Sequence, residues 1–278
     1  MNNIIINLSK KSWTRILISK IIRFFNIGNY EFKIAFNATN QRNNYAYCIF
    51  NAAKLAKSLG LLKISVIEFG CAGGNGLIAI EDIVKEVEKV FGIKIEVYGF
   101  DTGEGLPEPV DYKDLEYHWK KGFYKMDKEY LEYKLKISKI ILGNVKDTVP
   151  NFISKYNPAP IGCIFHDLDY YSSTKQSFLI FNEDNINFLP RVYNYFDDII
   201  GGETELYNDW TGERLAIKEF NEENKEKKLS PAYHLITRPI QYTWYHQIQI
   251  LHLFNHSHYG SFISDTDQQA MPYNKKIK

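Results

Sequence analysis

Cysteine is scarce in this chain, which has three thiols, Cys48, Cys71 and Cys163, in 278 residues. Two of them lie in apolar, strand-like surroundings, so we expect reduced core residues of a cytoplasmic protein rather than a disulfide framework. An excess of one charge is also missing, because the formal net charge is +1, and this gives no reason to expect nucleic acid as a partner. The sequence has no run of 18 apolar residues, so no segment is predicted to span a membrane.

Residues 10–25, KKSWTRILISKIIRFF, mix basic and apolar side chains. No small-residue cleavage site follows them, so a signal peptide is not expected. The segment is either a basic amphipathic helix lying on an anionic membrane surface or a helix that packs on its own domain or on a second subunit. The second interpretation is favoured, because amphipathic helices mostly cover cores. We expect residues 1–60 to be a helical lead-in, with a helix within 41–60.

Strand-like and helix-like segments alternate from residue 61 to the end of the chain. The expected strands are residues 63–70, 94–101, 137–143, 161–169 and 191–198, and a helical segment follows each of them. Two further strands, 232–237 and 246–254, are expected to pair as a hairpin across a turn-rich link without helix. This pattern predicts one α/β domain over 61–278, with a doubly wound, Rossmann-like, mainly parallel seven-stranded sheet and a terminal antiparallel strand. Ligands of such sheets bind beyond the carboxyl ends of the strands.

A glycine-rich turn ends the first strand, in the stretch SVIEFGCAGGNGL. The residues expected to face a ligand there are Glu68, Gly70, Gly73 and Gly74, with Gly76 after them. Asp101 ends the second strand, where a carboxylate can hold both hydroxyls of a ribose. A carboxylate at Glu68 would repel a dinucleotide pyrophosphate but not a cationic ligand. The turn therefore favours S-adenosylmethionine, which carries a sulfonium, an ammonium and an adenosine.

Aspartates end the fourth and fifth strands, in HDLDYYSST and YFDDIIGGE. Carboxylates at neighbouring strand ends, about 4.8 Å apart, repel one another unless a proton or a cation lies between them. All-oxygen ligation suits magnesium, and Asp167, Asp197 and Asp198 are the expected ligands. The alternative is that the aspartates cap the following helices, as Asp169 or Ser172 could.

These residues together resemble class I methyltransferases of the macrocin O-methyltransferase kind, which methylate sugar hydroxyls, over about residues 63–220. The most specific part is an Asp-x-Asp-x-Tyr-x-Ser-Thr pattern at 167–174, followed by the Asp197–Asp198 pair. FDTGEGLP (100–107) resembles the second motif of the family, and GNVKDTVP (143–150) resembles its segment after the third strand. The resemblance implies that Asp167, Asp197 and Asp198 hold magnesium and that Asn144 contributes to cofactor binding.

The chain departs from that pattern at four places. Leu168 replaces the usual glycine between the two aspartates, His166 stands where an apolar residue is usual, and 188–198 lacks the usual Pro-Gly-Gly turn. The last 55 residues match no sugar methyltransferase of known substrate. The acceptor therefore stays open among a glycan sugar, a small-molecule sugar, a phenol and a small polyol, and a homo-oligomer is possible.

The predicted reaction is magnesium-dependent methyl transfer from S-adenosylmethionine to a hydroxyl, which needs a base to take the hydroxyl proton. Asp169 and His166 are the candidates. His252, His256 and His258 could form a zinc site, although separate structural histidines are favoured. Two other functions stay open: a metal-dependent glycosyltransferase, because Asp-Leu-Asp resembles its Asp-x-Asp motif, and a non-catalytic methyltransferase-like binding protein.

Overall fold

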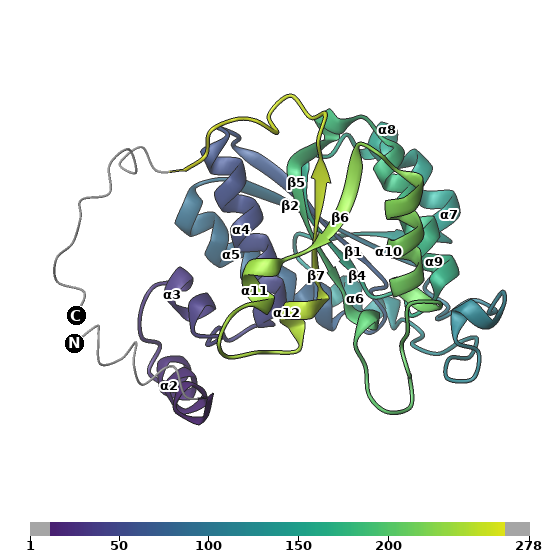
Figure 1. The fold of residues 1–278 in the computed structure, drawn as a ribbon, viewed down its shortest axis with the longest axis horizontal. Coiled ribbons are helices and arrows are strands. Elements are labelled where there is room, and N and C mark those ends of the chain that lie inside the picture. The colour runs from purple at the N-terminus through teal and green to yellow at the C-terminus, as the bar shows by residue number, and fades with distance from the viewer. Residues whose placement is uncertain (1–11, 265–278) are drawn as a thin grey trace.

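The computed structural model describes residues 12–264 and contains one seven-stranded sheet in the order β3-β2-β1-β4-β5-β7-β6 (Figure 1). Its strands are β1 Lys63–Phe69, β2 Lys94–Asp101, β3 Lys139–Leu142, β4 Ile161–His166, β5 Phe188–Phe196, β6 Lys227–Pro231 and β7 Ile248–Leu253. Strands β1 to β5 pair in parallel, and β7 runs antiparallel to both β5 and β6. The predicted fold class is therefore confirmed, with β7 as the antiparallel strand.

Helices cover both faces of the sheet (Figure 1). The α-helices are α2 Ser12–Phe24, α3 Tyr30–Ala35, α4 Asn43–Ser58, α5 Asn75–Phe91, α6 Lys128–Lys134, α7 Val145–Thr148, α8 Phe152–Tyr156, α9 Tyr171–Ser177, α10 Gly212–Glu223, α11 Tyr233–Ile236 and α12 Trp244–Gln247. The 3-10 helices are η1 Tyr112–Asp114, η2 Val149–Asn151, η3 Phe178–Asn182, η4 Asn185–Asn187 and η5 Asp197–Ile199. None of the helices within residues 12–264 has the length and apolar character needed to cross a membrane.

Two hydrophobic clusters lie on the two faces of the sheet. Helices α4 and α5 bury their apolar sides against one face, and α7 to α10 with η3 cover the other. Helix α4 belongs to the predicted lead-in, yet ten of its side chains are buried. Helix α4 and the sheet therefore share one core.

The last part of the sheet differs from the prediction. Residues 232–237, expected to be a strand, contain α11, and the strand that pairs with β7 is β6, just before them. The link between β6 and β7 also contains α12, although no helix was expected there. The hydrophobic pattern of AYHLIT is too short to separate a strand from a single helical turn, and only Leu235 of α11 is buried.

Candidate active site

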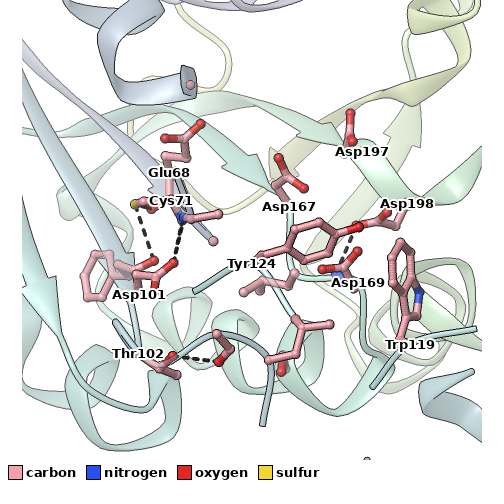
Figure 2. Close-up of a pocket in the computed structure, with 18 of the residues that line it drawn as sticks. Glu68, Cys71, Asp101, Thr102, Trp119, Tyr124, Asp167, Asp169, Asp197 and Asp198 are labelled. Carbon is pink, nitrogen blue, oxygen red and sulfur yellow. Dashed lines mark hydrogen bonds between the residues drawn. The ribbon is translucent and has the colours of Figure 1, made fainter. Parts of the chain in front are cut away.

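The strand register places four sequence-predicted segments side by side at one edge of the sheet. Phe69 of β1 is level with Phe100 of β2 and with His166 of β4, and His166 is level with Phe196 of β5. The next residues along these strands are therefore neighbours, namely Gly70, Asp101, Asp167 and Asp197. A cavity of about 480 Å³ opens there, lined by the glycine turn at one end and by the aspartates at the other (Figure 2).

The glycine turn is tight because the end of β4 lies directly against it. Gly70 has φ +83°, and a Cβ on it would lie 1.7 Å from the carbonyl oxygen of Asp167. Gly74 adopts the left-handed conformation as the N-cap of α5. A Cβ on Gly73 would meet nothing within 4 Å, and Gly73 lines the cavity. Gly70 and Gly74 therefore shape the turn, while Gly73 leaves room for a ligand.

Glu68 is buried beneath the turn, with one carboxylate oxygen paired and one not. Its Oε1 accepts a hydrogen bond of 2.9 Å from the Tyr45 hydroxyl, whereas its Oε2 is buried with no partner among the described residues. Burial raises the pKa of Glu68 to about 7, against the opposing effects of Tyr45 and Arg42. An unpartnered buried acceptor is costly, so Oε2 is suited to a donor that a bound ligand supplies.

Asp101 holds the glycine turn closed. Its Oδ2 accepts hydrogen bonds from the backbone N–H groups of Cys71 and Ala72, each 2.9 Å, and its Oδ1 accepts one from the Gly103 N–H. Figure 2 shows Asp101 beside Cys71 at the cavity wall. The residue predicted to bind a ribose therefore also fixes the shape of the turn above it.

Asn144 lines the same cavity, and its side chain caps α7 by accepting the Lys146 N–H at 3.1 Å. The structure thus brings five of the six residues predicted for the cofactor to the lining of the cavity: Glu68, Gly70, Gly73, Asp101 and Asn144. Gly74, the sixth predicted residue, is needed for the packing of the turn. A Cβ on it would lie 1.8 Å from the side chain of Leu131.

Asp167, Asp169, Asp197 and Asp198 line the opposite end of the cavity (Figure 2). Burial and then the neighbouring aspartates raise the pKa of Asp167 and of Asp169 well above the usual range, and the same causes raise that of Asp198 to about 7. The carboxylates of Asp167 and Asp169 accept no hydrogen bond from the described residues. An all-oxygen set of carboxylates that repel one another fits a hard cation, and Arg42, which also lines the cavity, supplies one positive charge near Asp167 and Asp197. No group of three metal donors within residues 12–264 forms a ready-made centre.

Asp198 is the most constrained of the four aspartates. Its Oδ2 accepts the Asp169 N–H at 2.9 Å, and its Oδ1 accepts the Tyr207 hydroxyl at 2.8 Å. The Asp198 N–H donates to the buried carboxylate of Glu213 at 2.9 Å. These bonds tie the ends of β4 and β5 to α10.

The helix-cap alternative does not describe these aspartates. Helix α9 has Tyr170 at its N-cap with no side-chain hydrogen bond. The carboxylate of Asp114, from another segment, satisfies the first turn of α9 instead. It accepts both the N–H and the hydroxyl of Ser172, each at 2.8 Å. Asp169 has φ +59°, a conformation that a non-glycine residue seldom adopts, and it lines the cavity.

His166 lies in the core rather than at the cavity. Its ring stacks on Phe196 at 4.3 Å, and its two nitrogens pair with the Ser177 hydroxyl at 3.1 Å and the Asn194 side-chain oxygen at 3.2 Å. Burial lowers the pKa of His166 to about 3. A base must reach the proton that it takes, and of the two predicted candidates only Asp169 lines the cavity.

Each of the three C-terminal histidine rings has a partner outside the set, and the His258 N–H also donates to His256 Nδ1 at 2.9 Å. His252 pairs with the Tyr259 hydroxyl, His256 with the Phe188 carbonyl and His258 with the Ser261 hydroxyl. Among the described residues they form no group of three metal donors, and their structural role stays a prediction.

Sequence reasoning missed several residues that complete the cavity. The side chains of Arg42, Trp119, Tyr124, Glu205 and Tyr207 contribute to its walls. Tyr124 and Trp119 belong to the segment between β2 and α6, and Figure 2 shows both beside the aspartates. Trp119 and Tyr124 lie in a segment without a periodic hydrophobic pattern. Only the high aromatic content of that segment could have indicated that they contribute to the cavity.

No protein-family profile matches this sequence, and no curated protein matches it. Among solved structures, the O-methyltransferase NovP is 15% identical with a TM-score of 0.52, over 77% of this chain and 83% of that one. The calicheamicin methyltransferase CalS11 is 19% identical with a TM-score of 0.48, over 73% of this chain and 77% of that one. The similarity to NovP shows that this chain has the fold of that O-methyltransferase.

Proposed function

We propose that this protein is an S-adenosylmethionine-dependent O-methyltransferase that acts, with magnesium, on a sugar or another polyhydroxylated small molecule. The observation that carries the proposal is the cavity itself. One end offers a buried, unpartnered carboxylate oxygen under a glycine turn, and the other offers a cluster of four aspartates. These two ends suit a cationic donor and a metal-chelating acceptor. The NovP fold supports the reaction class.

The first end has the groups that S-adenosylmethionine needs. Glu68 Oε2 is suited to accept from the ligand's ammonium group, and Gly73 leaves space at the cavity wall. Asp101 accepts three backbone hydrogen bonds, and the remaining lone pair of its Oδ1 can accept from a ribose hydroxyl. When bound, the cofactor supplies an electrophilic methyl group. The buried carboxylate strengthens the attraction to a cation, because water is excluded around it.

The second end suits the acceptor. Asp167, Asp197 and Asp198 are the residues that would hold magnesium, which when bound lowers the pKa of a chelated hydroxyl. Asp169 lies beside them and is suited to take the hydroxyl proton. Trp119 and Tyr124 cover this end of the cavity and limit the access of water.

Isothermal titration with S-adenosylmethionine, S-adenosylhomocysteine, NAD and a UDP-sugar tests the assignment. We expect micromolar binding of the first two ligands and none of the others. Binding of the UDP-sugar alone would identify a glycosyltransferase, and binding of none of the four would identify a non-catalytic protein. Glu68→Gln is the matched variant, because it keeps the size of the side chain and removes its charge.

A further inference from the structure

Helix α2 presents its apolar side to solvent. Trp13, Ile16, Leu17, Ile21 and Phe24 recur at the spacing of one helix face, and they are between 42% and 83% exposed. The side that faces the protein carries Thr14, Ser19 and Ile22 instead. An ordinary surface helix has the opposite arrangement, with its apolar stripe on the core.

The apolar surface continues past the end of the helix. Phe25 is 66% and Ile27 is 46% exposed, and both follow α2 directly in the chain. Figure 1 shows α2 beside α3 at the edge of the molecule, apart from the sheet and its covering helices. An apolar patch of this kind is typical of an interaction site. We call these seven side chains, Trp13 to Ile27, the α2 patch.

The charged residues of the N-terminal segment that contains the α2 patch have one sign. The first 30 residues contain five lysines and arginines and no aspartate or glutamate. Within α2, Lys20 lies in the exposed stripe and Arg23 beside it. No salt bridge among residues 12–264 involves a side chain of α2. The patch therefore offers apolar surface and uncompensated positive charge together.

We propose that the α2 patch binds the surface of an anionic lipid bilayer. Apolar and aromatic side chains with lysine and arginine are the features of a helix that lies in a membrane interface. Lys20 can extend its ammonium group to the headgroups while its stem stays apolar. A second copy of this chain is the less suitable occupant, because a two-fold contact through the patch would bring like charges together.

Helix α2 lies at the same end of the molecule as the cavity. In Figure 1 the arrow of β7 points upwards, so the antiparallel β5 and the strands parallel to it run downwards. Their carboxyl ends, which carry the cavity, therefore lie at the lower end of the view, and α2 lies at that same end. A protein held on a bilayer by α2 would work close to the membrane surface.

Vesicle flotation tests the proposal, with neutral phosphatidylcholine vesicles and with vesicles that also contain phosphatidylglycerol. We expect the full chain to float with the anionic vesicles and not with the neutral ones, and 0.5 M salt to weaken binding strongly. The triple variant Ile16→Ser, Leu17→Ser, Phe24→Ser should lose at least about tenfold in partitioning. Lys20→Glu should lose about fivefold or more, since each basic residue near such a surface contributes roughly that factor.

The matched control replaces three apolar residues of similar exposure elsewhere, Leu62, Val110 and Ile186, by serine and should float as the parent does. All variants alter exposed side chains, and unchanged melting temperatures will show that they fold. The proposal is overturned if the parent protein does not float with anionic vesicles. It is also overturned if light scattering shows that the parent is a dimer and that the triple variant is a monomer. Neither result would bear on cofactor binding in the cavity.

Discussion

Glu68 is a carboxyl group whose protonation is coupled to folding. Its pKa is raised from 4.5 to about 7 by burial, so the folded protein keeps a proton that the unfolded chain releases. The stability that this proton contributes is complete below pH 4.5 and is lost as the pH rises through 7. The pKa of Asp198 is also raised, so its ionisation likewise lowers the stability of the folded protein as the pH rises.

Glu68→Gln should remove the contribution of Glu68 to this pH dependence. The difference in unfolding free energy between the variant and the parent should grow from pH 5 to pH 8, by at most about 3 kcal/mol. Urea unfolding of the unliganded proteins at unit pH intervals measures it. A constant difference across that range would show that Glu68 is ionised in the folded state throughout.

Gly76 is required by its contact with Glu68 rather than by its backbone conformation. It lies in the first turn of α5, where alanine would normally be stabilising. A Cβ there would lie 1.7 Å from Glu68 Oε1, so Gly76→Ala should cost about 1–3 kcal/mol. Gly73→Ala, which meets no atom, should melt like the parent and lower only the affinity for S-adenosylmethionine. Equal melting temperatures for the two variants would contradict this assignment.

Strand β2 and the glycine turn are joined as elements through Asp101. Asp101→Ala removes the acceptor of two turn N–H groups, so we expect a stability loss of about 2–3 kcal/mol. Binding of S-adenosylmethionine should also weaken by roughly 30-fold or more. Thermal melting and isothermal titration measure the two effects, and Asp147→Ala, at an exposed carboxylate in α7, is the control. Parent-like binding by Asp101→Ala would rule out the ribose role.

The helices and strands that the sequence predicted well are those in which apolar residues recur with a clear period. The strand 94–101 has the predicted bounds, and helix 76–91 begins one residue early, because each carries a long apolar pattern between turn residues. The sequence also identified the strand ends that carry Glu68, Asp101 and Asp167. The structure was needed for contacts between distant segments, such as Tyr45 with Glu68 and Glu213 with Asp198. A polar side chain in a helix does not reveal which strand end it will meet.

At the scale of the whole molecule, the aspartate end of the cavity lowers the stability of the protein without a cation. Burial disfavours the charged carboxylate of Asp167, and Asp198 and Asp197 repel it. Asp167→Asn should therefore raise the melting temperature of the metal-free protein by about 2–4 °C, the equivalent of roughly 1 kcal/mol.

The parent should melt higher as magnesium is added, and Asp167→Asn should lose that response while it binds S-adenosylmethionine almost normally. A thermal-shift titration with magnesium, with and without cofactor, measures both effects. Glu222→Gln, which removes an exposed carboxylate, should behave like the parent. A parent that does not respond to magnesium would refute the metal assignment.

The contact between Gly70 and the carbonyl oxygen of Asp167 limits how such an enzyme could be re-engineered. A side chain at Gly70 would have to displace the backbone at the end of β4, which is where the proposed metal ligands begin. A library that varied the glycine turn to accept another donor molecule would therefore also disturb the acceptor end, and one that moved β4 for a larger acceptor would disturb the turn. Changes of donor and acceptor specificity would have to be selected together, with Gly70 left unvaried.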